Sequence, residues 1–157
     1  MSRTTIERFY AAFEQLDGAA MQACYAPNAR FEDEAFTLQG REEVGAMWQM
    51  LCDAVKTKGR DVWRLEVSQV TDNSAHWEAH YRFTATGRLV HNVIDAQFTF
   101  DAQGLILTHR DRFDFWRWSR QALGAPGLLL GWSGFLRGKV RAQAAKNLAA
   151  YRRKASA

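Results

Sequence analysis

Two side chains that can exchange protons, His109 and Asp111, stand two positions apart near the end of a run of alternating apolar and polar residues. Alternate residues of a β-strand share a face, so residues 109, 111 and 113 are predicted to lie on one face and Arg110 and Arg112 on the other. A carboxylate beside an imidazole orients the ring, and histidine is the natural acid or base near neutral pH. The pair predicts acid–base chemistry; the structural alternative is a polar pair at the rim of a core.

Asp33, in the stretch Phe-Glu-Asp-Glu, is the second candidate. A carboxylate that enters an apolar cavity has a raised pKa, which suits proton abstraction from carbon. The alternative is a solvated strand end. We predict that Asp33 is the base, that His109 is the acid or proton shuttle and that Asp111 orients the ring of His109. All three side chains should then face one enclosed cavity.

Other kinds of chemistry lack support in the sequence. It has no glycine-rich phosphate loop, no Ser-His-Asp order and no metal-ligand spacing, so neither a cofactor nor a metal is predicted. Cys24 and Cys52 are isolated and favour buried free thiols in a reducing compartment. The first residues lack the apolar stretch of a signal peptide, and no apolar run is long enough to span a membrane. These features predict a cytoplasmic protein.

The elements that must position the candidate residues follow from the spacing of apolar side chains in this chain of 157 residues. A helical period predicts three helices, over residues 6–16, a short segment that ends at Pro27, and residues 41–55. Residues 30–36 are predicted to be extended. A period of two then predicts strands over 63–67, 77–83, 94–100 and 105–115. Short polar turns between the strands predict an antiparallel meander, and the whole order predicts an α+β fold.

The charge of the chain is unevenly distributed. Residues 1–115 carry 12 basic and 17 acidic side chains, a net −5, whereas residues 116–157 carry 9 basic and no acidic side chains, a net +9. The second segment is predicted to be a helical extension packed on the first. Its apolar stripe comprises Leu128, Trp132, Leu136, Val140, Ala144, Leu148 and Tyr151. A membrane-surface helix is a less favoured alternative, and nucleic-acid binding is not expected.

Two stretches of the chain resemble a known superfamily, the SnoaL-like and ketosteroid-isomerase-like proteins of the nuclear transport factor 2-like fold. They read RFYAAFEQLDGAAMQACYAPNARFEDE and TGRLVHNVIDAQFTFDAQGLILTHRDRFD, and the resemblance covers roughly residues 4–115. It implies a cone-shaped curved antiparallel sheet wrapped around three N-terminal helices, one deep apolar pocket, and a homodimer formed through the outer face of the sheet. Residues 1–115 would be the cone domain.

The resemblance also assigns individual positions. The catalytic carboxylate of the isomerases falls on Asp33, whereas their two oxyanion donors fall on Phe9 and Ala96, so steroid isomerisation by their mechanism is disfavoured. Their pocket aromatics fall on Tyr25 and Trp48. Together with the alternation of the strands, this gives the predicted substrate-binding set, which is Phe9, Tyr10, Tyr25, Trp48, Trp77, Tyr81, Phe83, Asn92, Ala96, Phe98 and Phe113.

The sequence therefore predicts a protein with a pocket for a small apolar molecule. One reading is a cofactor-free acid–base enzyme on an apolar oxygenated substrate, with isomerisation, cyclisation, dehydration and hydrolysis all open. The other reading is a non-catalytic ligand-binding or dimeric interaction module, which the loss of both oxyanion donors favours. His76, His80 and His91 are predicted to lie on the outer face of the sheet.

Overall fold

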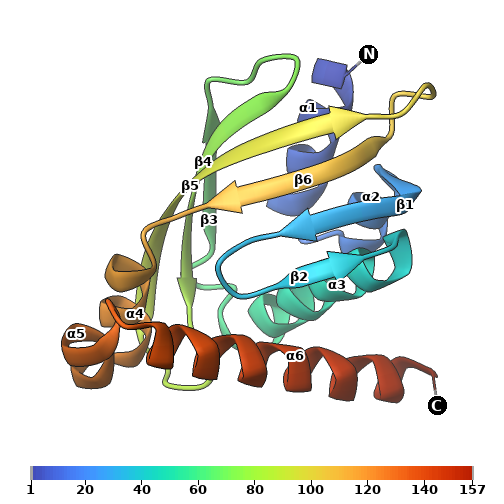
Figure 1. The fold of residues 1–157 in the computed structure, drawn as a ribbon. Coiled ribbons are helices and arrows are strands. Elements are labelled where there is room, and N and C mark those ends of the chain that lie inside the picture. The colour runs from blue at the N-terminus through green and yellow to red at the C-terminus, as the bar shows by residue number, and fades with distance from the viewer. Residues whose placement is uncertain (1, 157) are drawn as a thin grey trace.

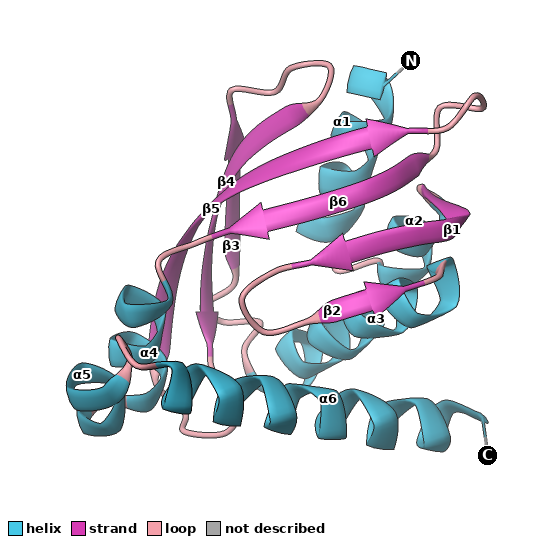
Figure 2. Ribbon diagram, viewed as in Figure 1, coloured by secondary structure: helices cyan, strands magenta, loops and turns pink. Residues whose placement is uncertain are grey.

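A computed structural model describes residues 2–156 and shows a curved six-stranded sheet with the N-terminal helices on its concave side and the C-terminal helices along one end (Figures 1 and 2). The helices are α1 (Ser2–Glu14), α2 (Gly18–Ala23), α3 (Arg41–Lys58), α4 (Phe115–Leu123), α5 (Ala125–Leu130) and α6 (Gly134–Ser156). The strands are β1 (Tyr25–Glu32), β2 (Thr37–Gln39), β3 (Arg64–Ser68), β4 (Ser74–Arg82), β5 (Leu89–Phe100) and β6 (Ile106–Arg112). The α+β class predicted from the sequence is confirmed.

The strand order is β2-β1-β6-β5-β4-β3. Strands β3 to β6 form the predicted antiparallel meander, but β1 pairs with β6 in parallel, which the alternation of β6 alone could not predict. The register places Phe31 of β1 and Phe98 of β5 on either side of His109. Because β1 and β6 run in the same direction, their C-terminal ends meet at one end of the sheet.

Three predicted boundaries were wrong. Helix α2 ends at Ala23, and Pro27 lies inside β1 instead of ending the helix. Of the predicted extended segment 30–36, only residues 30–32 lie on a strand, the end of β1, and residues 33–36 form the turn that precedes β2. The last strand ends at Arg112, because the carboxylate of Asp114 accepts a hydrogen bond from the backbone N–H of Arg117 and caps α4. Phe115 therefore lies on a helix and not on the strand.

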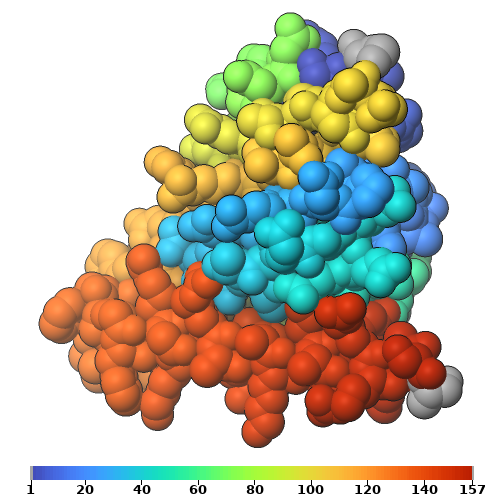
Figure 3. All heavy atoms as spheres, turned by 45° about the vertical axis from the view of Figure 1, so that its right-hand side comes forward, coloured from blue at the N-terminus to red at the C-terminus, as the bar shows by residue number. Residues whose placement is uncertain are grey.

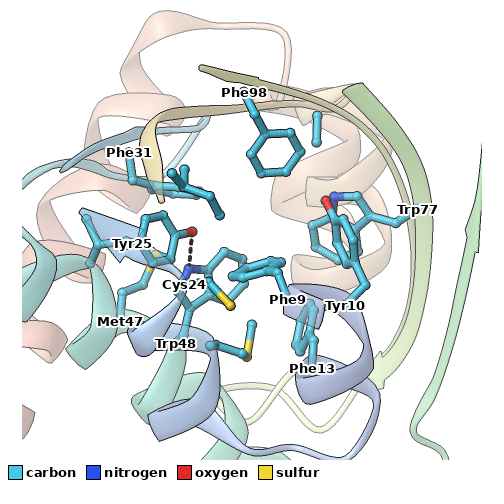
Figure 4. Close-up of a cluster of buried hydrophobic side chains, with 14 of the residues drawn as sticks. Phe9, Tyr10, Phe13, Cys24, Tyr25, Phe31, Met47, Trp48, Trp77 and Phe98 are labelled. Carbon is cyan, nitrogen blue, oxygen red and sulfur yellow. Dashed lines mark hydrogen bonds between the residues drawn. The ribbon is translucent and has the colours of Figure 1, made fainter. Parts of the chain in front are cut away.

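The core forms between the concave face of the sheet and helices α1 and α3 (Figure 4). Buried residues of β5 alternate with exposed or half-buried ones, which confirms the predicted period of two. Aromatic rings from α1, α3 and the strands contact one another; the Phe9 and Trp48 ring centroids are 5.5 Å apart and those of Phe13 and Trp48 are 5.1 Å apart. The two cysteines are free and buried, as predicted.

The C-terminal segment runs along one end of the molecule, beside α3 and the turn between β1 and β2 (Figures 1 and 3). Leu148 is buried in the main core, and Leu136 is buried in a second cluster under α4. The Tyr151 hydroxyl donates to Asp53 at 2.6 Å, and Arg152 pairs with Glu43 at 3.3 Å. This half of the apolar stripe is covered.

The other half of the stripe was predicted wrongly. Leu128 is 53% exposed and Trp132 is 77% exposed. The segment is not one helix, because Gly124, with φ +72°, ends α4 and the chain turns again before Gly134. Gly127 packs against the backbone of Ser119 so closely that a Cβ would clash, and this contact turns the neighbouring leucines outward. No described helix is long and apolar enough to cross a membrane.

Candidate functional site

A chain of hydrogen bonds runs through the core and ends at Asp111. The Trp48 indole N–H donates to the Tyr25 hydroxyl oxygen at 2.9 Å (Figure 4), and that hydroxyl lies 2.7 Å from Nδ1 of His109. Nε2 of His109 lies 2.8 Å from Oδ1 of Asp111, which also accepts from the Trp77 indole at 3.4 Å. Because the Asp111 carboxylate can only accept, Nε2 of His109 carries the proton of the neutral ring and donates to it, and Nδ1 is then the acceptor for the Tyr25 hydroxyl proton. Asp111 is therefore the acceptor at which all these donors converge.

His109 is sealed inside the protein. Its side chain is fully buried, and the rings of Phe9, Phe31 and Phe98 surround it with centroid distances of 5.6, 5.0 and 4.3 Å. Both ring nitrogens already have protein partners, so His109 can act on a bound molecule only through Asp111. The predicted alternation is confirmed, since His109 and Asp111 are buried while Arg110 and Arg112 are exposed.

Asp33 lies just beyond the end of β1, in a tight turn. Its Oδ1 accepts from the backbone N–H groups of Ala35 and Phe36, both at 2.7 Å, and its own N–H donates to the Phe36 carbonyl. The pKa of Asp33 is raised from 3.8 to about 7, chiefly by burial and also by the nearby charge of Asp111, while the backbone N–H groups of Phe36 and Ala35 and the charge of Arg141 act in the opposite direction. Asp33 can therefore carry a proton near neutral pH.

A groove of about 820 Å³ lies where β1 and β6 end, and its lining includes Asp33 and Asp111, although the Asp111 side chain is only 3% exposed. Helix α6 forms another side of the groove, because Arg141 donates to the carbonyls of Asp33 and Glu34 at 3.1 Å and Arg137 pairs with Glu34 at 3.1 Å. The remaining lining residues are Glu32, Val93, Asp95, Arg110, Arg112, Phe113 and Asp114. This groove is open and largely charged, unlike the enclosed apolar cavity that the sequence predicted.

The predicted substrate-binding residues lie in three places. Phe113 lines the groove. Phe9, Tyr10, Tyr25, Trp48, Trp77, Ala96 and Phe98 are buried in the main core, where the rings pack on one another. Tyr81 and Phe83 contact Trp118 of α4, and Asn92 is buried on the inner face of β5. Arg137 and Arg141 were missed, because they fall off the apolar stripe and no local signal brings them to the groove.

One buried hydroxyl stands out near this chain. The Tyr10 Oη is buried without a hydrogen-bond partner among the described residues. Burial raises the pKa of Tyr10 well above its usual value, and the charges of Asp111 and Tyr25 add to that rise. The Tyr10 ring packs on Trp77, with centroids 6.1 Å apart. An unpaired donor beside Asp111 is a group that could hydrogen-bond a molecule reaching this carboxylate.

The outer face of the sheet holds the remaining histidines, as predicted. Glu78 bridges His76 at 3.0 Å and His91 at 2.7 Å, and the His80 and His91 rings stack with centroids 4.1 Å apart. The Asp95 and Glu78 carboxylates raise the pKa of His76. Among residues 2–156 no group of three or more side chains is arranged to hold a metal ion.

Comparisons with known proteins agree with this architecture. The model of the SnoaL-like domain matches residues 6–109, and the sequence matches no curated protein. A provisionally assigned polyketide cyclase from Silicibacter sp. TM1040 superposes with TM-score 0.59 at 18% identity, covering 76% of this chain and 93% of that one. An LEH-like epoxide hydrolase from M. tuberculosis superposes with TM-score 0.58 at 16% identity, covering 82% and 92%.

A provisionally assigned isomerase from Bacillus subtilis superposes with TM-score 0.56 at 16% identity, covering 79% of this chain and 94% of that one. At these identities the likeness concerns the fold alone. The family match is broader evidence, because it spans more than half of the chain, from Ile6 within α1 to His109 on β6. The chain belongs to the SnoaL-like domain family.

Proposed function

We propose that the protein is an acid–base enzyme that acts on a small oxygenated molecule in the groove between Asp33 and Asp111. The observation that carries this proposal is the pairing of two carboxyl groups in different surroundings within one groove. Asp33 has a pKa of about 7, while Asp111 accepts hydrogen bonds from His109 and Trp77. Two carboxyl groups whose environments differ in this way can divide the roles of acid and base.

In this proposal the roles differ from those predicted from the sequence. Asp111 takes a proton from a carbon of the substrate or from an attacking water, because its partners leave it as an acceptor. Asp33 in its protonated form gives a proton to the substrate oxygen on which charge develops. When the proton comes from carbon, the C–H electron pair forms a C=C bond and the carbonyl π pair moves to the oxygen that Asp33 protonates. When the proton comes from water, the new bond from the water oxygen to carbon forms as the ring C–O bond breaks, and the pair of the broken bond goes to the oxygen that Asp33 protonates. Afterwards the two carboxyl groups exchange protons with water through the open groove.

His109 acts as a positioning residue. Its Nε2–H fixes one oxygen of Asp111, and Tyr25 fixes the ring tautomer from the other side, with Trp48 holding the Tyr25 hydroxyl. A buried, fully paired network of this kind holds the carboxylate in one orientation. Tyr10, whose hydroxyl has no partner among residues 2–156, is a candidate for the role of the oxyanion-donor tyrosine whose position Phe9 occupies.

The test follows proton transfer directly. The protein is incubated with a panel of small cyclic ketones and epoxides, first in D₂O with NMR detection of exchange at carbon, then in ¹⁸O-water with mass spectrometry of ring-opened products. Asp33→Asn and Asp111→Asn are expected to lower the rate at least ~100-fold, the usual contribution of a positioned acid or base. Asp95→Asn is the matched control, because Asp95 lines the same groove but its side chain is 76% exposed.

The second candidate is a non-catalytic ligand-binding module. It is favoured by Phe9 and Ala96, two buried residues with no hydrogen-bond donor in their side chains, which stand at the positions of the isomerases' two oxyanion donors. Compounds of the panel that bind, as seen by NMR line broadening, without exchange or ring opening would support this module and contradict the enzyme. Equal rates in the wild type and both Asn variants would likewise contradict the proposed roles.

A further inference from the structure

The corner formed by α4 and α5, at the lower left of Figure 1, has several large apolar side chains that are exposed. We call it the α5 corner. Its members are Trp116, Leu128, Leu129, Leu130, Trp132 and Phe135, with exposures of 39, 53, 67, 42, 77 and 65%. Single exposed apolar residues are common, but six large ones gathered within twenty residues mark an interaction surface.

The α5 corner is held in place by its own backbone contacts. The Trp116 indole donates to the Leu128 carbonyl at 3.2 Å, and the Trp132 indole donates to the Leu129 carbonyl at 2.9 Å. On its inner side, Gly127 and Gly131 pack against Ser119 with no room for a Cβ. The leucines therefore point outward because the glycine side of α5 is the side that packs on α4.

Cationic groups without acidic partners lie beside this surface. Arg88, Arg117 and Arg120 line a shallow depression of about 590 Å³ together with Leu89 and Gln121. The Arg120 guanidinium lies 4.1 Å from the Trp116 ring centroid, so the depression adjoins the α5 corner. Within the described chain none of these three arginines forms a salt bridge, whereas Arg137 and Arg152 do. The Nε of Arg120 is buried and has no partner among the described residues.

The charges of this region decide which occupant fits. Residues 115–156 contain no acidic side chain, and Lys139 lies 4.9 Å from the Phe135 ring. A symmetric contact between two α5 corners would place these cations against each other, because a two-fold interface pairs a patch with itself. An apolar cluster beside arginines that form no salt bridge within the described chain instead fits a partner with an apolar interior and a negatively charged surface.

We propose that the α5 corner binds the surface of an anionic lipid bilayer. The apolar side chains enter the interfacial layer, and Arg88, Arg117 and Arg120 contact headgroup phosphates, to which guanidinium groups donate paired hydrogen bonds. Contact of this kind is peripheral, and it weakens with ionic strength because the headgroup attraction is screened.

The test is co-sedimentation of the full chain with vesicles of phosphatidylcholine alone or mixed with phosphatidylglycerol. Binding is expected with the anionic vesicles only, and it should fall as salt is raised. The triple variant Arg88→Gln, Arg117→Gln, Arg120→Gln and the double variant Leu129→Ser, Phe135→Ser should each weaken binding at least ~10-fold. A Lys146→Gln, Arg153→Gln, Lys154→Gln variant, which removes the same charge from exposed positions on α6, should bind like the wild type.

Tryptophan emission supplies a second measurement. Trp132 is the most exposed tryptophan at 77%, so its emission should shift to the blue when anionic vesicles are added, and Trp132→Phe should remove most of the shift. Absence of binding to anionic vesicles would overturn the proposal, as would equal weakening by the α6 control variant. If Leu129→Ser, Phe135→Ser instead converts a dimer into a monomer in light scattering while vesicles never bind, the α5 corner is an interface between two copies.

Discussion

Replacing Asp33 with asparagine tests the electrostatics of the groove without knowledge of the substrate. Asparagine has the shape of the protonated acid, and its oxygen can still accept from Ala35 and Phe36, which bond Oδ1 in the native turn. The pKa of Asp33 is about 7 in the folded protein against an ordinary value of 3.8. The folded protein thus binds this proton more tightly than the unfolded chain does, so protonation stabilises the fold.

The sign and size of the effect follow from that difference. The stabilisation from the Asp33 proton is fully present below pH 3.8 and is lost as the pH rises through about 7. Between pH 5 and pH 8 the free energy of unfolding of the wild type should fall by roughly 2–3 kcal/mol, at about 1.4 kcal/mol for each pKa unit. Asp33→Asn lacks this titrating group and should not show that fall. The stability of the variant relative to the wild type should therefore increase with pH, although the variant is expected to lose activity.

The assay is urea unfolding of both proteins at half-unit steps from pH 5 to pH 8, plotted as the difference in the free energy of unfolding. Taking the difference cancels the other titrating groups. Asp72→Asn is the control, because Asp72 is an exposed carboxylate in a turn and its difference curve should be flat. A flat curve for Asp33→Asn would show that Asp33 is an ordinary surface acid, and the proposed proton donor would have to be abandoned.

Three further predictions concern the core, the C-terminal segment and assembly. Tyr25→Phe leaves Nδ1 of His109 and the indole of Trp48 without a partner, so unfolding by urea should become easier by about 2–4 kcal/mol; a loss below 0.5 kcal/mol would show that the hydrogen-bonded chain is unimportant. Leu148→Ala should cost about 2–5 kcal/mol because Leu148 is 4% exposed, whereas Leu128→Ala, at a 53% exposed position, should stay within about 0.5 kcal/mol. Equal losses in the two leucine variants would contradict the described docking of α6. Light scattering at micromolar concentration should report a dimer formed through the outer face of the sheet, and a monomer would count against that arrangement.

The sequence alone determined most of the fold. Periods of 3.6 and 2 identified α1, α3 and the strands of the meander, because amphipathic elements must each turn one side to the same core. The same alternation placed His109 and Asp111 inward and Arg110 and Arg112 outward, as the structure confirms. These features depend on neighbours within a few residues, which the sequence contains directly.

Only the tertiary structure decided which groups meet at the site. Asp33 and Asp111 line one groove because β1 pairs with β6 in parallel, and the pairing of Phe31 with His109, 78 positions apart, has no local signature. Likewise, Arg141 of α6 donates to the carbonyl of Asp33 although the two residues are 108 positions apart in the sequence. Glycines 124, 127 and 131 could be read as weak points in a helix, but the direction in which α5 turns depends on its contact with Ser119. That contact left Leu128 and Trp132 exposed, where their spacing alone had predicted burial.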